Sequence, residues 1–147
     1  MNKGQSMFEV VVAIFIITLI TIGVIVVSTN SVSNSSFSRN STLAGRYAQE
    51  AIEWLRDEEA INTTLFKTRI ALSIYCLNNL AWGNTGICGS SEEVVGSNNV
   101  FKREATLTNS QISGKNIIQA VVKVYWTDSK GTHEVSSTTN FSDIRER

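Results

Sequence analysis

The sequence GQSMFEVVVAIFIITLITIGVIVV, residues 4–27, decides how the rest of the chain is organised. Its apolar run, residues 10–27, is 18 residues long, has no charge, and includes only Thr18 and Thr21 as polar members. As an α-helix this run would be about 27 Å long, close to the hydrocarbon thickness of a bilayer. The stretch therefore predicts one membrane-spanning helix near the N-terminus.

Glu9 stands directly before the apolar run and needs a physical explanation. An unpaired charge in apolar surroundings costs at least a few kcal/mol, so Glu9 would need a positive partner if such helices bundled together. A free α-amino group at Gln5, with a reference pKa near 8, would supply that partner. It would come from the same helix, four residues away, or from a neighbouring subunit shifted by about one turn, roughly 5.4 Å. The simpler alternative for Glu9 is an interfacial residue of an ordinary membrane anchor.

A short basic leader ending in Gly4, a new N-terminus at Gln5, a glutamate fifth from that terminus and an apolar helix together resemble the type IV prepilin signature. The resemblance implies cleavage after Gly4 by a prepilin peptidase, N-methylation of Gln5 and polymerisation through the apolar helix. It further implies that Gln5, Phe8 and Glu9 act in assembly. Two features depart from the best-known major pilins, because Gln5 stands where many have phenylalanine and the run contains no proline.

Charge and composition bear on compartment and partners. The chain of 147 residues has 13 basic and 13 acidic residues, so its net charge implies no general attraction to nucleic acid. Lys3 and the amino terminus favour a cytoplasmic N-terminus, with everything after the apolar run outside. A secretory signal peptide is the alternative, but its apolar region is 7 to 15 residues long, shorter than this run. We expect a single-pass protein of the cytoplasmic membrane that becomes part of a cell-surface or extracytoplasmic filament.

The two cysteines, Cys76 and Cys88, fall in the predicted external part. In an oxidising compartment a disulfide between them is expected, with a stabilisation of roughly 3 kcal/mol in the chain-entropy model. Their spacing is not a C-x-x-C redox motif, and a zinc site would need more ligands than the single His133 adds. We expect Trp82, inside this loop, to form a small local core.

A second helical pattern follows a polar stretch at residues 28–36. Leu43, Tyr47, Ala51 and Leu55 recur every four residues, which predicts an amphipathic helix. We therefore expect one long helix over residues 5–59, with Gly23 and residues 28–36 as its weakest section. Residues 47–56 resemble the segment of minor pilins and pseudopilins that packs against the head domain.

Acidic residues gather late in this predicted helix. A calcium site would need six or more oxygens on a shaped loop, so we expect a solvated face countered by Arg46 and Arg56. The acidic residues are Glu50, Glu53, Asp57, Glu58 and Glu59.

The remainder of the chain predicts a small antiparallel sheet. Residues 62–72 are expected to form an irregular connection with a short helix, and residues 73–99 a loop-rich segment. Alternating patterns predict strands near residues 101–108, 117–126 and 135–141, with the middle one central in the sheet and a turn at residues 128–131. In the first strand Phe101, Arg103, Ala105 and Leu107 share one face.

The expected fold class is α+β and pilin-like: a long N-terminal helix, half apolar and half amphipathic, on a small antiparallel sheet with a disulfide loop. The expected parts are a leader at 1–4, a transmembrane and assembly helix at 5–27, the amphipathic half at 28–60 and an extracytoplasmic head at 61–147.

No catalytic motif stands out in the sequence. His133 lies next to Glu134, but adjacent strand residues point to opposite faces, so a solvated histidine is expected rather than a catalytic base. Core packing is expected for Trp126 rather than a role in a stacking platform with Tyr75 and Trp82. We expect no enzymatic activity, cofactor or metal.

The expected function is that of a minor pilin or pseudopilin, a structural subunit of a type IV pilus or a type II secretion pseudopilus. Its expected partners are other pilin subunits through the N-terminal helix, the prepilin peptidase, a membrane assembly platform and, before assembly, the lipid bilayer. The alternative is a single-pass anchored extracellular binding module, with residues 75–88 as a candidate ligand loop.

Overall fold

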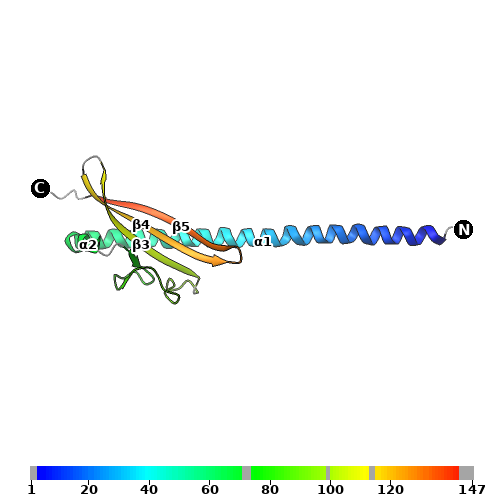
Figure 1. Ribbon diagram of the computed structural model, residues 1–147, viewed down its shortest axis with the longest axis horizontal. Helices are drawn as coiled ribbons and strands as arrows, with labels where there is room; N and C mark the ends of the chain where they lie inside the picture. Colours follow the sequence, from blue (N-terminus) through cyan, green and yellow to red (C-terminus); the bar gives the residue numbers. More distant parts are fainter. Residues whose placement is uncertain (1–2, 71–73, 99, 113–114, 143–147) are drawn as a thin grey trace. The chain divides into compact units, whose positions relative to one another are not determined.

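The computed structural model describes residues 3–70, 74–98, 100–112 and 115–142, and the side chains of residues 3–6, 112 and 115 lie outside this description. The chain divides into two compact units, Met1–Arg39 and Asn40–Arg147. We call the second unit the head. Figure 1 shows the course of the chain through its helices and strands.

Helix α1 runs from Lys3 to Ile61, a length of 59 residues. It confirms the long helix predicted for residues 5–59. The polar stretch at 28–36, predicted as the weakest section, is helical throughout. From Ala44 onward one side of α1 is buried, because Ala44, Ala51 and Leu55 have no exposed surface. This side contributes residues of the hydrophobic core.

A short helix, α2 (Thr63–Arg69), follows α1 directly. The side chain of Asn62 caps it by accepting a hydrogen bond from the backbone N–H of Leu65 at 3.0 Å. Phe66 is its buried residue. The short helix predicted within residues 62–72 is confirmed, while positions 71 and 72 of that range lie outside the described residues.

The head contains a five-stranded antiparallel sheet with the strand order β2-β1-β3-β4-β5. The three predicted strands are present and longer than expected: β3 (Phe101–Ile112), β4 (Lys115–Asp128) and β5 (Gly131–Ser142). β4 lies between β3 and β5, so its predicted central position is confirmed. The segment 73–99, expected to be loop-rich, also contains two short strands that were not predicted, β1 (Ile74–Cys76) and β2 (Asn84–Thr85).

The hydrophobic core of the head lies between the sheet and α1. β4 contributes Ala120, Val122 and Val124 with no exposed surface. Trp126 is 2% exposed, which confirms the prediction that it packs in the core. Described core residues begin at Ala44, so the head builds its core from its own unit. The α+β fold class predicted from the sequence is therefore correct.

The β4–β5 connection is the predicted tight turn. Gly131 adopts a φ of 125°, a left-handed conformation that favours glycine. The Asp128 carboxylate accepts a hydrogen bond from the backbone N–H of Lys130 at 2.7 Å. This bond, followed by the contact with His133, lowers the pKa of Asp128.

Candidate functional site

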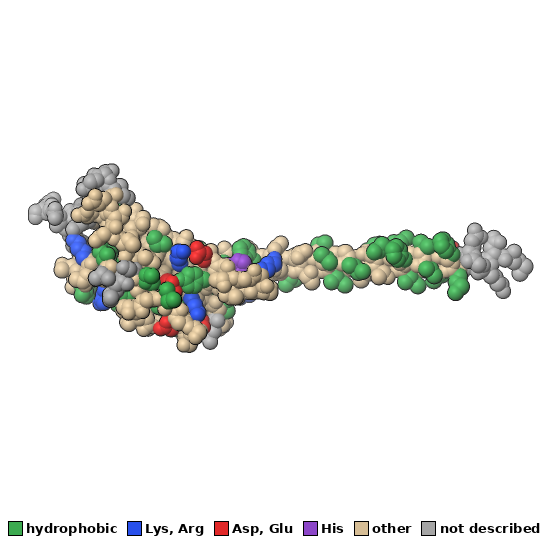
Figure 2. Space-filling view, in the orientation of Figure 1, with side chains coloured by type: hydrophobic (Ala, Val, Ile, Leu, Met, Phe, Trp, Pro, Cys, Tyr) green, Lys and Arg blue, Asp and Glu red, His purple; other side chains and the backbone are tan. Residues whose placement is uncertain are grey.

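The stem, defined as residues 7–27 of α1, presents its apolar side chains to the outside. None of its most apolar 18-residue window is buried against the described part of the chain. Exposed fractions of its large apolar side chains range from 38% at Val12 to 76% at Met7, and Figure 2 shows hydrophobic side chains all along it. Apolar surface left in water costs about 25 cal/mol per Å². The stem therefore requires lipid or other protein around it, and by length and composition it can cross a membrane.

The two polar side chains of the apolar run are already satisfied within the helix. The Thr18 hydroxyl donates to the carbonyl oxygen of Ile14, and the Thr21 hydroxyl donates to that of Ile17, both at 2.8 Å. An unsatisfied hydroxyl costs several kcal/mol when it is moved from water to an apolar medium. Because both hydroxyls are bonded internally, neither needs a partner from solvent or from a neighbouring molecule.

The predicted cleavage and assembly residues lie at the N-terminal end of α1. The bond between Gly4 and Gln5 falls in the first turn, where the helix has N–H groups without intrahelical acceptors and opens most easily. Phe8 is 73% exposed and Glu9 is exposed beside it. The helix places Glu9 one turn from Gln5, the spacing at which side chains of one helix meet.

The head contains a buried cation, Arg103, whose burial was not predicted from the sequence. The Arg103 side chain is 2% exposed and forms an ion pair with Glu50 at 2.6 Å. Its Nε donates to the carbonyl oxygen of Leu77 at 2.9 Å, and its Nη1 also donates to that of Tyr47 at 3.0 Å. Arg103 thus joins β3, the segment after β1 and helix α1.

Two opposing effects act on the charge of Arg103. Burial lowers the pKa of Arg103, while the hydrogen bond and negative charge of Glu50 raise it. The guanidinium group of arginine is not deprotonated in proteins, so Arg103 stays charged. The signal that pointed to this site was the alternation in β3, which placed Arg103 on the same face as Phe101 and Leu107.

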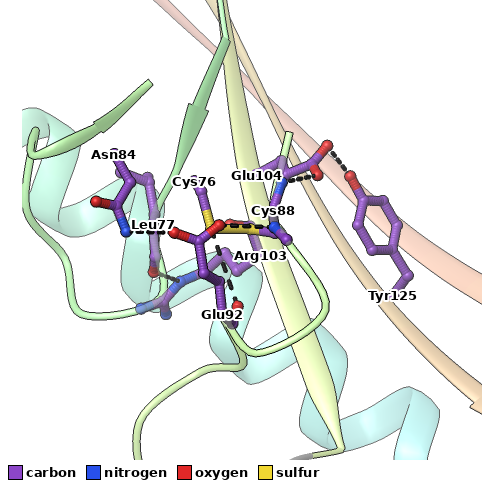
Figure 3. Close-up of a disulfide and its surroundings, with 9 residues drawn as sticks. Cys76, Leu77, Asn84, Cys88, Glu92, Arg103, Glu104 and Tyr125 are labelled. Carbon is purple, nitrogen blue, oxygen red and sulfur yellow. Dashed lines mark hydrogen bonds between the residues drawn. A yellow bond between two sulfur atoms is a disulfide. The ribbon is translucent and has the colours of Figure 1, made fainter. Parts of the chain in front are cut away.

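The predicted disulfide joins Cys76 in β1 to Cys88, with a Cα–Cα distance of 4.9 Å. Figure 3 shows the bond with Glu104 and Tyr125 on one side and Glu92 and Asn84 on the other. Glu104 accepts a hydrogen bond from the Cys88 backbone N–H at 2.7 Å. Glu92 accepts bonds from the Asn84 side chain at 2.8 Å and from the Gly89 backbone at 2.6 Å. Two carboxylates therefore fasten the loop in addition to the disulfide.

Tyr125 completes this cluster on the sheet face away from α1. Its hydroxyl donates to the second carboxylate oxygen of Glu104. Partial burial, followed by the hydrogen bond to Glu104, raises the pKa of Tyr125. The phenol thus remains a neutral hydrogen-bond donor at physiological pH.

Trp82 packs against the helices rather than forming the small local core expected inside the disulfide loop. Its ring centroid lies 4.8 Å from that of Trp54 and 4.9 Å from that of Tyr75, and its indole N–H donates to Glu58 at 2.6 Å. A loop of this length contains too few apolar residues to bury an indole. Trp54 of α1 lies close by and packs against the Trp82 ring instead.

The acidic face of α1 is only partly the solvated surface that was expected. Glu53 pairs with Arg56 at 2.9 Å with both side chains about half exposed, as predicted. Glu50 and Glu58, however, bind Arg103 and Trp82 of the head. These two carboxylates have structural roles because strand β3 and the disulfide segment lie against this part of the helix.

His133 is also less solvated than expected. Its side chain is 24% exposed and lies 3.0 Å from the Asp128 carboxylate, and its ring lies 5.3 Å from that of Trp126. His133 is thus on the α1 side of β5, opposite the exposed Glu134, as the strand alternation predicted.

Three polar groups of the segment proposed as a ligand loop, residues 75–88, are engaged within the chain. Asn84, Trp82 and the Cys88 backbone each bind a carboxylate of the same chain. One hollow, of about 240 Å³, lies near α2 with Glu59, Lys67 and Phe141 among its lining residues, and it is smaller than most small-molecule sites, which begin near roughly 300 Å³. Another, of about 440 Å³, has Lys102 and Tyr125 among its lining residues.

Within residues 3–70, 74–98, 100–112 and 115–142, no three His, Cys, Asp or Glu side chains are grouped so as to hold a metal ion. Comparisons with protein-family models, with curated proteins and with solved structures find no match to this chain.

Proposed function

We propose that this protein is a minor pilin or pseudopilin, a structural subunit of a type IV pilus or of a type II secretion pseudopilus. One observation carries the proposal: an apolar helix without internal cover is joined to a head that has its own core and disulfide. Such a chain needs one environment for its stem and another for its head. A membrane first, and then a bundle of identical or related stems, satisfies both.

Processing would prepare the stem for assembly. A prepilin peptidase would cleave after Gly4, and the α-amino group of Gln5 would be methylated. With a reference pKa near 8, that amine is largely cationic at neutral pH. It would then neutralise Glu9 when stems leave the bilayer, because a buried carboxylate is tolerated only with a charged partner. Phe8, exposed beside Glu9, would contribute apolar contact between neighbouring stems.

The position of the protein follows from this scheme. Before assembly the stem would lie in the cytoplasmic membrane with the N-terminus inside and the head outside. An assembly platform would then move the subunit into a filament whose shaft consists of stems. The head, crossed by a disulfide, suits an oxidising extracytoplasmic compartment.

The direct test is the intact mass of the protein purified from its native membrane or surface fraction. We expect a chain that begins at Gln5 and carries one additional methyl group. A Gly4→Arg variant should retain residues 1–4, because the small residue at the cleavage position is lost. An Asn2→Arg variant is the matched control, since it adds the same charge to the leader but leaves the Gly4–Gln5 bond unchanged, and it should be processed normally.

A chain that retains Met1 in the wild-type protein, with the stem in the membrane, would point to an ordinary anchor and refute the pilin proposal. Processing that is equal in Gly4→Arg and Asn2→Arg would show that another protease acts here. Either outcome would leave the anchored binding module as the better account.

A further inference from the structure

A third hollow of the head combines apolar walls with two charged side chains. It has a volume of about 160 Å³ and is lined by the end of α1, by α2 and by Trp82 from the segment between the two cysteines. Phe66 and Trp82 are among its apolar residues, and Glu58 and Arg69 are its charged ones. All of these residues belong to the second unit, so the hollow does not depend on the stem.

The ring of Trp82 contacts both charged side chains. Its indole N–H donates to the Glu58 carboxylate at 2.6 Å. The guanidinium carbon of Arg69 lies over the ring, 5.3 Å from the ring centroid. Trp82 thus binds the carboxylate through its N–H and the cation through its face.

Arg69 lacks a partner that would balance its charge. A guanidinium is always charged in proteins and has five N–H donors. Within the described residues Arg69 forms no ion pair with a carboxylate, and its buried Nε has no hydrogen-bond acceptor. Burial raises the pKa of Tyr75, although the charge of Arg69 opposes this shift. The Tyr75 phenol is therefore neutral and does not compensate the cation.

The size of the hollow and the surface of its rim restrict what can occupy it. A cavity of roughly 150 Å³ holds one benzene molecule, so this hollow has space for one apolar side chain. Ile61 and Leu65, which also line it, are 79% and 49% exposed. The apolar surface therefore continues outside the hollow, and a ligand that filled the hollow alone would leave this rim in water.

We infer that this hollow binds the C-terminal residue of another protein, and that this residue has an apolar side chain. The side chain fills the hollow and the free α-carboxylate binds Arg69, the residue whose planar fork matches a carboxylate. The residues that precede the terminus cover Ile61 and Leu65.

Two observations favour a chain terminus over other occupants. A terminal residue carries its apolar side chain and its carboxylate together, as a hollow for one side chain beside one unpaired arginine requires. An internal acidic segment would need two residues for the same contacts, and a small free acid would leave the rim uncovered. The inference does not rest on the proposed function, because it holds equally for a pilin subunit and for an anchored binding module.

The test titrates the full-length protein in detergent with two forms of one tripeptide, N-acetyl-Ala-Val-Phe. One form ends in a free carboxylate and the other in an amide, and the NMR signal of the Trp82 indole N–H reports binding. We expect the acid to bind about ten-fold more tightly than the amide, because only the acid gives Arg69 a charged acceptor.

Variants of the protein separate the charge from the apolar rim. Arg69→Gln should remove the difference between acid and amide. Lys67→Gln is the matched control and should retain the difference, since Lys67 lies on the same helix but lines a different hollow. Ile61→Ser changes an exposed side chain and leaves the core intact. It should weaken the tripeptide acid by about five-fold and leave the binding of 3-phenylpropanoate unchanged, because that acid fills the hollow only.

Several results would overturn the inference. Equal affinity for acid and amide in the wild-type protein would do so, as would a preference for the acid that persists in Arg69→Gln. If 3-phenylpropanoate binds as tightly as the tripeptide acid, the hollow is a site for small acids. If an amidated peptide with an internal Phe-Asp pair binds as tightly, the occupant is an internal acidic segment. Retention of residues 1–4 would refute the pilin proposal without altering these affinities, so the two failures are distinguishable.

Discussion

At the scale of single residues, Arg103 shows how the head depends on one buried charge. Its partner Glu50 is about half exposed, so the pair has water on one side and the core on the other. Removing one member of a buried ion pair leaves an uncompensated charge, and the penalty exceeds the net value of the pair. Surface pairs behave differently, because solvent replaces the lost partner. Helix α1 offers one example of each: Glu50 pairs with a buried arginine, and Glu53 forms an exposed surface pair.

We predict that Glu50→Ala destabilises the head by about 2 kcal/mol or more, since it leaves Arg103 charged and buried. Glu53→Ala removes an exposed pair with Arg56 and should cost at most about 0.5 kcal/mol. Chemical denaturation of the two variants measures both values in the same helix with the same substitution. Equal effects would mean that Arg103 finds sufficient water or carbonyl oxygens without Glu50.

This site marks a limit of prediction from sequence at the residue scale. The alternation in β3 placed Arg103 with Phe101, Ala105 and Leu107, which was correct. The alternation did not show that Arg103 would be fully buried. Its burial depends on the carboxylate of Glu50, which lies 53 positions away in the sequence. Long-range pairs of this kind leave no periodic trace in the sequence.

At the scale of elements, the disulfide segment is a separate unit fastened to a regular sheet. β3, β4 and β5 pair along their whole lengths. β1 and β2 contribute five paired residues between them, and their position depends on the cystine and on the carboxylates of Glu92 and Glu104. We expect local opening to begin in this segment, because it has few ladder hydrogen bonds.

We predict that the double variant Cys76→Ser, Cys88→Ser loses about 3 kcal/mol of stability, the value for closing a loop of this length. Amides of residues 76–98 should exchange faster in the folded variant, while those of β3 and β4 keep their order of protection. Hydrogen exchange of the reduced wild-type protein is the control, and it should match the variant. A uniform increase across β3, β4 and β5 would show that the disulfide supports the whole head.

Length explains which elements were predictable. α1 and the three long strands extend over enough residues to show a period of four or of two, and all were predicted in the correct order. β1 and β2, with three and two residues, are too short for any period to appear. They exist because β3 supplies a template on which a short segment can pair.

At the scale of the whole molecule, the chain joins two units with different requirements. The helix of the stem was predictable from sequence alone, because its apolar run packs against no other described part of the chain and does not depend on tertiary contacts. The packing of the head could not be predicted from the sequence, because its core combines residues of α1 with residues of the sheet. The described core residues all lie in the second unit.

We predict that a chain beginning at Asn40 folds as a soluble monomer, with a thermal midpoint within about 5 °C of the full-length protein in detergent, because truncation removes none of these core residues. A Leu55→Ala variant of the same shortened chain should lose about 2 to 5 kcal/mol, since Leu55 has no exposed surface. Calorimetry and sedimentation measure both. Aggregation or lack of a cooperative transition in the shortened chain would show that the head needs the first unit to fold.

The hydroxyl bonds of Thr18 and Thr21 have a consequence for the reversibility of the proposed assembly. A side chain that exchanged hydrogen-bond partners on leaving the bilayer would make one direction of transfer costly. Because both acceptors lie in the same helix, neither bond has to change when the helix moves from lipid to a bundle, and the contribution of the two hydroxyls would cancel between these states. In the proposed assembly, return of a subunit from filament to membrane would therefore break no hydrogen bond of these two residues.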